Sequence, residues 1–94
     1  MTVVALAYLT VRNSKEREFE SMMKEMFDTA KRLGVSGQLW RRQENPSQFI
    51  IVASMEKREN YASFQSSPEG RRLSRELMQL AEIRARAWAD VVEV

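Results

Sequence analysis

The closing stretch RARAWADVVEV, residues 84–94, begins with a strict alternation of two kinds of side chain. Alanines occupy positions 85, 87 and 89, whereas Arg86 and Trp88 fall on the other parity. Successive side chains of a strand point to opposite faces of a sheet, so this pattern predicts a strand from about Arg84 with one small and one bulky face. We expect the alanine face to lie beneath helices, because small side chains allow a close approach, and the bulky face to need another partner.

The first half of the chain predicts a strand followed by an amphipathic helix. The run VVALAYLTV, residues 3–11, is apolar on both parities, which is typical of a strand covered on both faces. Asn13 and Glu16 have the spacing of an N-terminal capping pair, and Gly34 has the position of a helix terminator. Between them the apolar residues are three or four positions apart and form one stripe: Phe19, Met22, Met23, Met26, Phe27, Ala30 and Leu33.

The second half predicts a hairpin, two helical segments and the closing strand. Residues 36–44 and 48–55 read as strands, and Asn45-Pro46-Ser47 between them is typical turn sequence. This turn would place Trp40 across from Ala53. A short helix over 57–66 is followed by a second one, for which Ser67 is the cap and Pro68 the first residue. The inner stripe of that second helix is Leu73, Leu77, Leu80 and Ala81.

The resulting order is β-α-β-β-α-β, the ferredoxin-like arrangement of the α+β class. We expect one domain over residues 1–94, with a four-stranded antiparallel sheet and the helices on one face. The residues predicted for the open face are Leu6, Tyr8, Gln38, Trp40, Arg42, Phe49, Ile51, Met55, Arg86, Trp88 and Asp90. Such a face is too apolar to remain in water, so we expect a homodimer that packs sheet against sheet. Trp40, Ile51 and Trp88 are the predicted dimer interface.

Composition excludes several classes of function. The 94 residues contain no cysteine and no histidine, so thiol and serine–histidine catalysis are excluded, and we expect no metal site. No apolar run approaches the roughly 20 residues of a membrane span, and no basic segment precedes the apolar start, so we expect neither a span nor a leader peptide. Lack of cysteine fits a cytoplasmic protein. Nucleic acid is not the expected partner, because strand 48–55 lacks the aromatic RNA-binding pattern.

The segment FIIVASMEKRENYASFQSSPEGRRL, residues 49–73, resembles the antibiotic biosynthesis monooxygenase domain of the dimeric α/β barrel superfamily. The resemblance extends over nearly the whole chain. It implies a homodimer, a small pocket between sheet and helices and, in some members, cofactor-free oxidation of aromatic polyketide-like or quinol substrates. Met55 stands where members often have tryptophan, and Phe64 where they often have histidine. Haem degradation, which other members perform, is excluded because no histidine can hold the iron.

Two hypotheses follow for the function. In the first, the protein is a small cofactor-independent monooxygenase that acts on an aromatic or quinone-type metabolite. Arg42 or Arg86 would stabilise a phenolate, and the residues that would hold the substrate are Tyr8, Trp40, Asn60 and Tyr61. In the second, the protein is a non-catalytic homodimer that binds a small hydrophobic ligand or has a structural role. The six methionines allow an adaptable pocket wall as well as an ordinary core.

Overall fold

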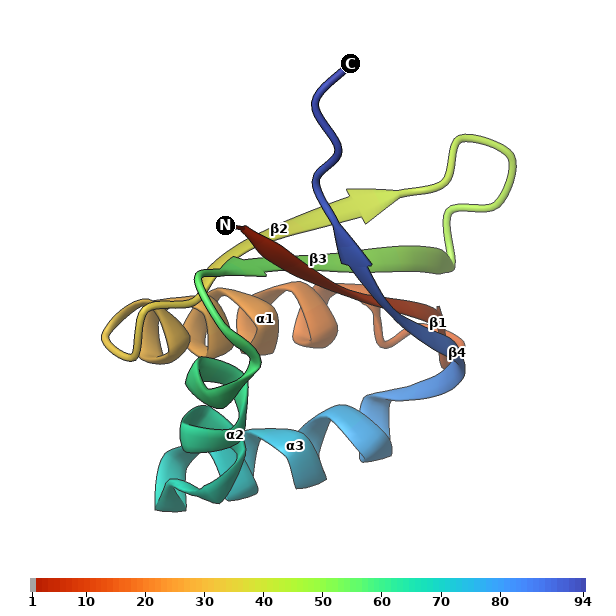
Figure 1. Cartoon of the computed structure of the whole chain (residues 1–94). Coiled ribbons are helices and arrows are strands. Elements are labelled where there is room, and N and C mark those ends of the chain that lie inside the picture. The colour runs from red at the N-terminus through yellow and green to blue at the C-terminus, as the bar shows by residue number, and fades with distance from the viewer. Residues whose placement is uncertain (1) are drawn as a thin grey trace.

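The computed structural model describes residues 2–94 as one sheet covered by helices (Figure 1). The element order is β1 (Val3–Val11), α1 (Glu16–Lys31), β2 (Ser36–Arg41), β3 (Gln48–Met55), α2 (Arg58–Ser66), α3 (Pro68–Leu80) and β4 (Ala81–Asp90). The sheet is antiparallel and four-stranded, in the order β2-β3-β1-β4. All three helices lie on one face, and the opposite face is bare (Figure 1). The predicted ferredoxin-like fold is therefore confirmed. The two helical segments predicted between the hairpin and the closing strand are α2 and α3, which Ser67 separates.

The core lies between the sheet and the stripe of α1. Phe19 and Met23 of α1 are almost completely buried, as are Leu9 of β1 and Phe49 of β3. The rings of Phe19 and Phe49 are 4.9 Å apart and tilted by 50°. Burial of one such large side chain contributes about 1.5–3 kcal/mol, so the stripe read from the sequence is what docks α1 on the sheet.

The ends of the helices follow the sequence signals in two cases and depart from them in one. Gly34, with φ of 82°, ends α1 as predicted: its N–H and that of Val35 bond back to the carbonyls of Lys31 and Ala30. The Ser67 hydroxyl accepts a 3.0 Å hydrogen bond from the Gly70 N–H and caps α3. The predicted capping pair at the start of α1 is wrong.

Instead of opening α1, Asn13 lies in a turn. The Lys15 N–H donates to the Arg12 carbonyl, and Ser14 adopts a left-handed φ of 63°. The Arg12 guanidinium donates to the Gln79 carbonyl at 3.0 Å, and this bond ties the turn to the end of α3. The helix can begin only after this turn, at Glu16.

The hairpin register differs from the prediction by three residues. Trp40 pairs with Ile50, and Gly37 pairs with Ala53. The turn is correctly located, because the Asn45 side chain accepts from the Ser47 N–H and its carbonyl accepts from the Gln48 N–H. However, β2 already ends at Arg41, and the connection is longer than the turn alone. The shift changes parity, so it moves Phe49, Ile51 and Met55 from the predicted open face to the helix-covered face.

The parity of β4 is also the reverse of the prediction. Ala81 and Ile83 pair with Val11 and Leu9 on the helix-covered face, but the register then shifts at a β-bulge between Tyr8 and Leu9. Arg84 is the extra residue, and beyond it the faces exchange. The strand also begins three residues earlier than predicted, at Ala81, so Ala81 belongs to β4 and not to the helix.

The bulge settles which residues lie under the helices. Arg86 and Trp88 pair with Ala7 and Ala5 on the helix-covered face. The alanines at 85, 87 and 89 pair with Tyr8, Leu6 and Val4, so they lie on the open face. The prediction that the alanine side supports the helices is therefore wrong.

Candidate functional site

A cavity of about 490 Å³ lies between the helix-covered face of the sheet and the three helices. Its size falls within the usual range of ligand pockets, roughly 300–1,000 Å³. We call it the sheet–helix cavity and define it by its main lining residues: Ala5, Ala7, Met26, Phe27, Ala30, Ile51, Ala53, Arg58, Tyr61, Gln65, Ser74, Leu77, Met78, Ile83, Arg86 and Trp88. The small alanine side chains of β1 and β3 leave the space that the cavity fills.

One wall of the cavity is aromatic and cationic. The rings of Tyr61 on α2 and Trp88 on β4 meet edge to face, with centroids 5.7 Å apart. The Arg58 guanidinium lies over the Trp88 ring, 4.6 Å from its centroid. Arg86 lines the same cavity from β4. Arg58 is 28 positions from Arg86 and 30 from Trp88 in the sequence, and the bulge in β4 brings the two β4 residues to the face that Arg58 covers.

Hydroxyl and amide groups supply the remaining polarity. The Tyr61 hydroxyl accepts a 3.1 Å hydrogen bond from the Gln65 amide, which leaves its own O–H free to donate. Ser74 of α3 also lines the cavity. The cavity can therefore offer a phenol, a hydroxyl and two guanidinium groups to a ligand with an apolar body.

Of the residues predicted for the site, the cavity brings together only Arg86 and Tyr61. Trp40 and Tyr8 lie on the open face, where 50 % and 39 % of their surfaces are exposed. Arg42 lies just beyond β2 and binds the Gln48 side chain at 2.9 Å. None of these three side chains lines the cavity, because Tyr8 and Trp40 point to the open face and Arg42 lies beyond the end of β2.

Asn60 has a structural role in the observed fold. Its amide donates to the Leu33 carbonyl at 3.1 Å and accepts from the Lys57 N–H at 3.2 Å. Both ends of the side chain are thus used to join the end of α1 to the start of α2.

Two residues predicted for the dimer interface, Ile51 and Trp88, instead line the cavity.

Sequence reasoning missed Arg58 as a site residue. Its only local signal is its place at the start of a short helix, where charged residues are common. Arg58 was not predicted because the expected parity of β4 placed Trp88 on the open face. The contact between Arg58 and Trp88 exists only with Trp88 on the helix-covered face.

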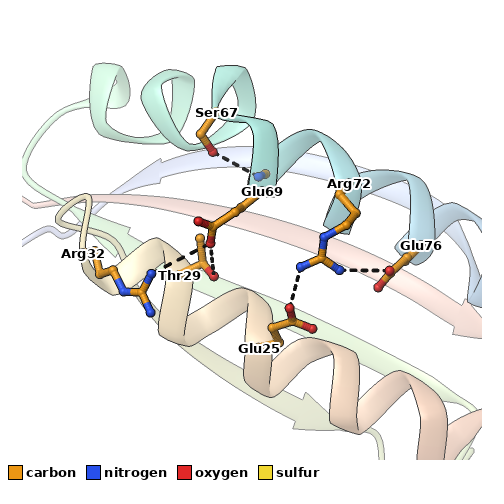
Figure 2. A network of polar contacts seen from close by, with 8 residues as sticks. Glu25, Thr29, Arg32, Ser67, Glu69, Arg72 and Glu76 are labelled. Carbon is orange, nitrogen blue, oxygen red and sulfur yellow. Dashed lines mark hydrogen bonds and ion pairs between the residues drawn. The ribbon is translucent and has the colours of Figure 1, made fainter.

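A polar network holds α1 and α3 together outside the cavity (Figure 2). Arg72 of α3 forms an ion pair with Glu25 of α1. It forms a second one, at 3.0 Å, with Glu76 of its own helix. The hydrogen bonds that Arg72 donates, first to Glu25 and then to Glu76, raise the pKa of Arg72. The guanidinium was already cationic at neutral pH, so the raised pKa leaves this clamp independent of Arg72 titration in that range.

Glu69 forms a second link of the network. The Thr29 hydroxyl donates to its carboxylate at 3.3 Å, and Arg32 approaches the same oxygen at 3.9 Å (Figure 2). Among residues 2–94, no three acidic side chains gather closely enough to ligate a metal ion. No helix in the same range is long and apolar enough to cross a membrane.

Comparison with known proteins identifies the fold. No family model matches the sequence. No curated protein matches it either. Solved structures do match over almost the whole chain. SnoaB from Streptomyces nogalater, a cofactor-independent oxygenase, is 16 % identical with a TM-score of 0.87, and the match covers 99 % of this chain and 95 % of that one.

Two further structures are proteins assigned as candidate antibiotic biosynthesis monooxygenases. One, from Bordetella bronchiseptica, is 19 % identical with a TM-score of 0.86 and 98 % coverage of both chains. The other, from Nitrosomonas europaea, is 13 % identical with a TM-score of 0.80, and covers 94 % of this chain and 86 % of that one. At these identities the likeness concerns the fold, and the chain has the ferredoxin-like fold found in antibiotic biosynthesis monooxygenase structures.

Proposed function

We propose that the protein is a small cofactor-independent monooxygenase-like enzyme that oxidises an aromatic or quinone-type metabolite in the sheet–helix cavity. The observation that carries the proposal is the cavity itself, which Arg86 lines together with the Tyr61–Trp88 ring pair and a set of apolar side chains. Its support from comparison is the shared fold of SnoaB, which is a cofactor-independent oxygenase.

The chemistry needs an electron-rich aromatic anion and access for dioxygen. A nearby guanidinium favours the ionised form of a phenolic hydroxyl, so Arg86 would lower the pKa of the substrate. The free O–H of Tyr61 would donate to the same oxygen. The resulting phenolate gives up an electron to dioxygen far more readily than the neutral phenol does, and the aromatic wall would hold the ring in place.

The test uses oxygen consumption with a panel of phenols and hydroquinones. Arg86→Gln is expected to lower turnover by about 100–1,000-fold, the usual cost of removing one oxyanion donor. Arg42→Gln is the matched control, because that exposed arginine lies outside the cavity and should leave turnover unchanged. Equal loss in both variants, or no loss in Arg86→Gln, would contradict the proposed role.

A second candidate function is non-catalytic binding of a small hydrophobic ligand. The apolar lining favours it, since Met26, Leu77 and Met78 can adapt to different shapes. A ligand that raises the melting temperature without oxygen consumption across the panel would favour binding over catalysis.

For assembly we propose a homodimer through the open sheet face. Tyr8 and Trp40 expose large aromatic surfaces there, beside the half-buried Leu6, Ile50 and Val52. The alanines of β4 make the adjoining part of this face flat, so a second sheet could approach closely.

A further inference from the structure

Among residues 2–94, the two arginines of the sheet–helix cavity lack the carboxylate partner that five of the nine other arginines have. Arg32, Arg41, Arg42, Arg72 and Arg84 each pair with a glutamate. Among residues 2–94, neither Arg58 nor Arg86 forms an ion pair, and no Asp or Glu lines the cavity. The cavity therefore carries positive charge that the protein itself does not neutralise.

Charge and apolar surface are separated within the cavity. Arg58 and Arg86 are exposed to solvent, and Trp88 is 37 % exposed. The apolar lining residues Ala53, Met26 and Leu77 are each 8 % exposed. Cationic groups thus stand on the solvent side of the cavity, and its inner part is apolar.

Arg58 is also held in place without being neutralised. Its guanidinium lies over the Trp88 ring, a contact that limits its movement, and no hydrogen bond within residues 2–94 occupies its N–H groups. A carboxylate accepts two such N–H groups at once, and these charge-assisted bonds are about twice as strong as neutral ones.

We propose that the natural ligand is a planar apolar carboxylic acid, whose carboxylate is bound by Arg58 at the solvent side while its ring system enters the cavity. Arg86 adds a second positive charge beside the ring. This assignment rests on the proposed function and narrows its substrate class from aromatic metabolites in general to aromatic acids. Arg58 is then a binding residue that decides specificity, distinct from the oxyanion role of Arg86.

The experiment compares naphthoate with naphthamide, which have nearly the same size and shape but differ in charge. Binding is measured by isothermal titration calorimetry on the whole protein at low and at high salt. Naphthoate is expected to bind at least about tenfold more tightly, a difference of roughly 1.4 kcal/mol. In Arg58→Gln this preference should fall to about twofold or less, while naphthamide affinity changes little.

Arg75→Gln is the matched control, because Arg75 is an exposed arginine of α3 that does not line the cavity. It should retain the full preference for naphthoate. Equal binding of the two probes to the wild type would overturn the carboxylate assignment but leave the cavity as a ligand site. Binding of neither probe would overturn the assignment together with the basis of the proposed function. A preference that survives in Arg58→Gln would place the carboxylate elsewhere and also overturn the proposal.

Discussion

At the scale of single residues, the contact between Gly37 and Phe27 shapes one end of the cavity. A Cβ at Gly37 would lie 2.2 Å from Cδ1 of the Phe27 ring, far inside van der Waals contact. The absence of a side chain on β2 is therefore what allows this ring to rest on the strand. Phe27 lines both the sheet–helix cavity and a more open hollow between α1 and Leu39 of β2, so the ring lies between the two.

Gly37→Ala is expected to destabilise the protein by roughly 1–3 kcal/mol, because the new methyl group overpacks the Phe27 site. Denaturant unfolding measures this loss. In a Phe27→Leu background the same glycine substitution should cost less, since the smaller side chain leaves room for the methyl group. Additive losses in the double variant would show that the clash with Phe27 is not the cause.

At the scale of elements, the bulge in β4 decides what the cavity contains. Leu9 pairs with Ile83 and Tyr8 with Ala85, so Arg84 has no place in the ladder. If Arg84 paired with Tyr8 in a regular ladder, alternation would carry Arg86 and Trp88 to the open face. A single irregularity thus supplies the cavity with its aromatic wall and one of its arginines.

Deletion of Arg84 is expected to change the free energy of unfolding by about 1 kcal/mol or less, because the remaining residues form a continuous ladder with the same faces. Deletion of Ile83 is the matched control. It shortens β4 by the same amount but moves Arg84 into the half-buried position of Ile83, and should cost about 2 kcal/mol or more. Urea unfolding compares the two, and equal losses would contradict the bulge assignment.

The contact between α1 and α3 depends more on buried apolar side chains than on ion pairs. The α1–α3 contact combines buried apolar side chains with the clamp formed by Arg72, Glu25 and Glu76 (Figure 2). Ion pairs this exposed contribute little to stability and are screened by salt. The buried stripe therefore determines how the helices cover the cavity, and the clamp adds only orientation.

At the scale of the whole molecule, the helices cover one face of the sheet and leave the other bare (Figure 1). The bare face has fewer large apolar side chains than predicted, because Phe49, Ile51 and Met55 lie on the helix-covered face. Tyr8 lies on β1, an inner strand of the sheet, between Ile50 of β3 and Ala85 of β4. It is therefore the position at which the proposed dimer is most directly tested.

Tyr8→Glu is expected to convert the proposed dimer into a folded monomer, because a carboxylate there would be buried without a partner between two sheets. Sedimentation or light scattering measures the mass, and circular dichroism checks the fold. Gln79→Glu adds the same charge on the exposed side of α3 and should leave the dimer intact. A wild-type protein that is monomeric at micromolar concentration would refute the dimer.

Much of the architecture could be predicted from the sequence, and much of the site could not. The apolar stripe of α1, the Gly34 terminator and the Ser67 cap act within a few residues of themselves, so the chain alone determines where these helices lie. The same holds for the order of strands and the turn at Asn45. Arg86 and Tyr61 were predicted for the site because their residue types suit the chemistry, and both line the cavity, whereas Arg58 was not predicted because nothing local links it to Trp88.

Only the tertiary structure decided which face each strand presents. Side-chain direction in a strand alternates with every residue, so one extra residue at Arg84 and a register shift of three in the hairpin each reverse a face completely. The alternation of large and small side chains in RARAWAD does not show which parity faces the helices, because either orientation of the strand would have the same pattern. The sequence by itself therefore determined the elements and their order, while packing against β1 and the helices determined that the arginine and tryptophan of β4 line a cavity.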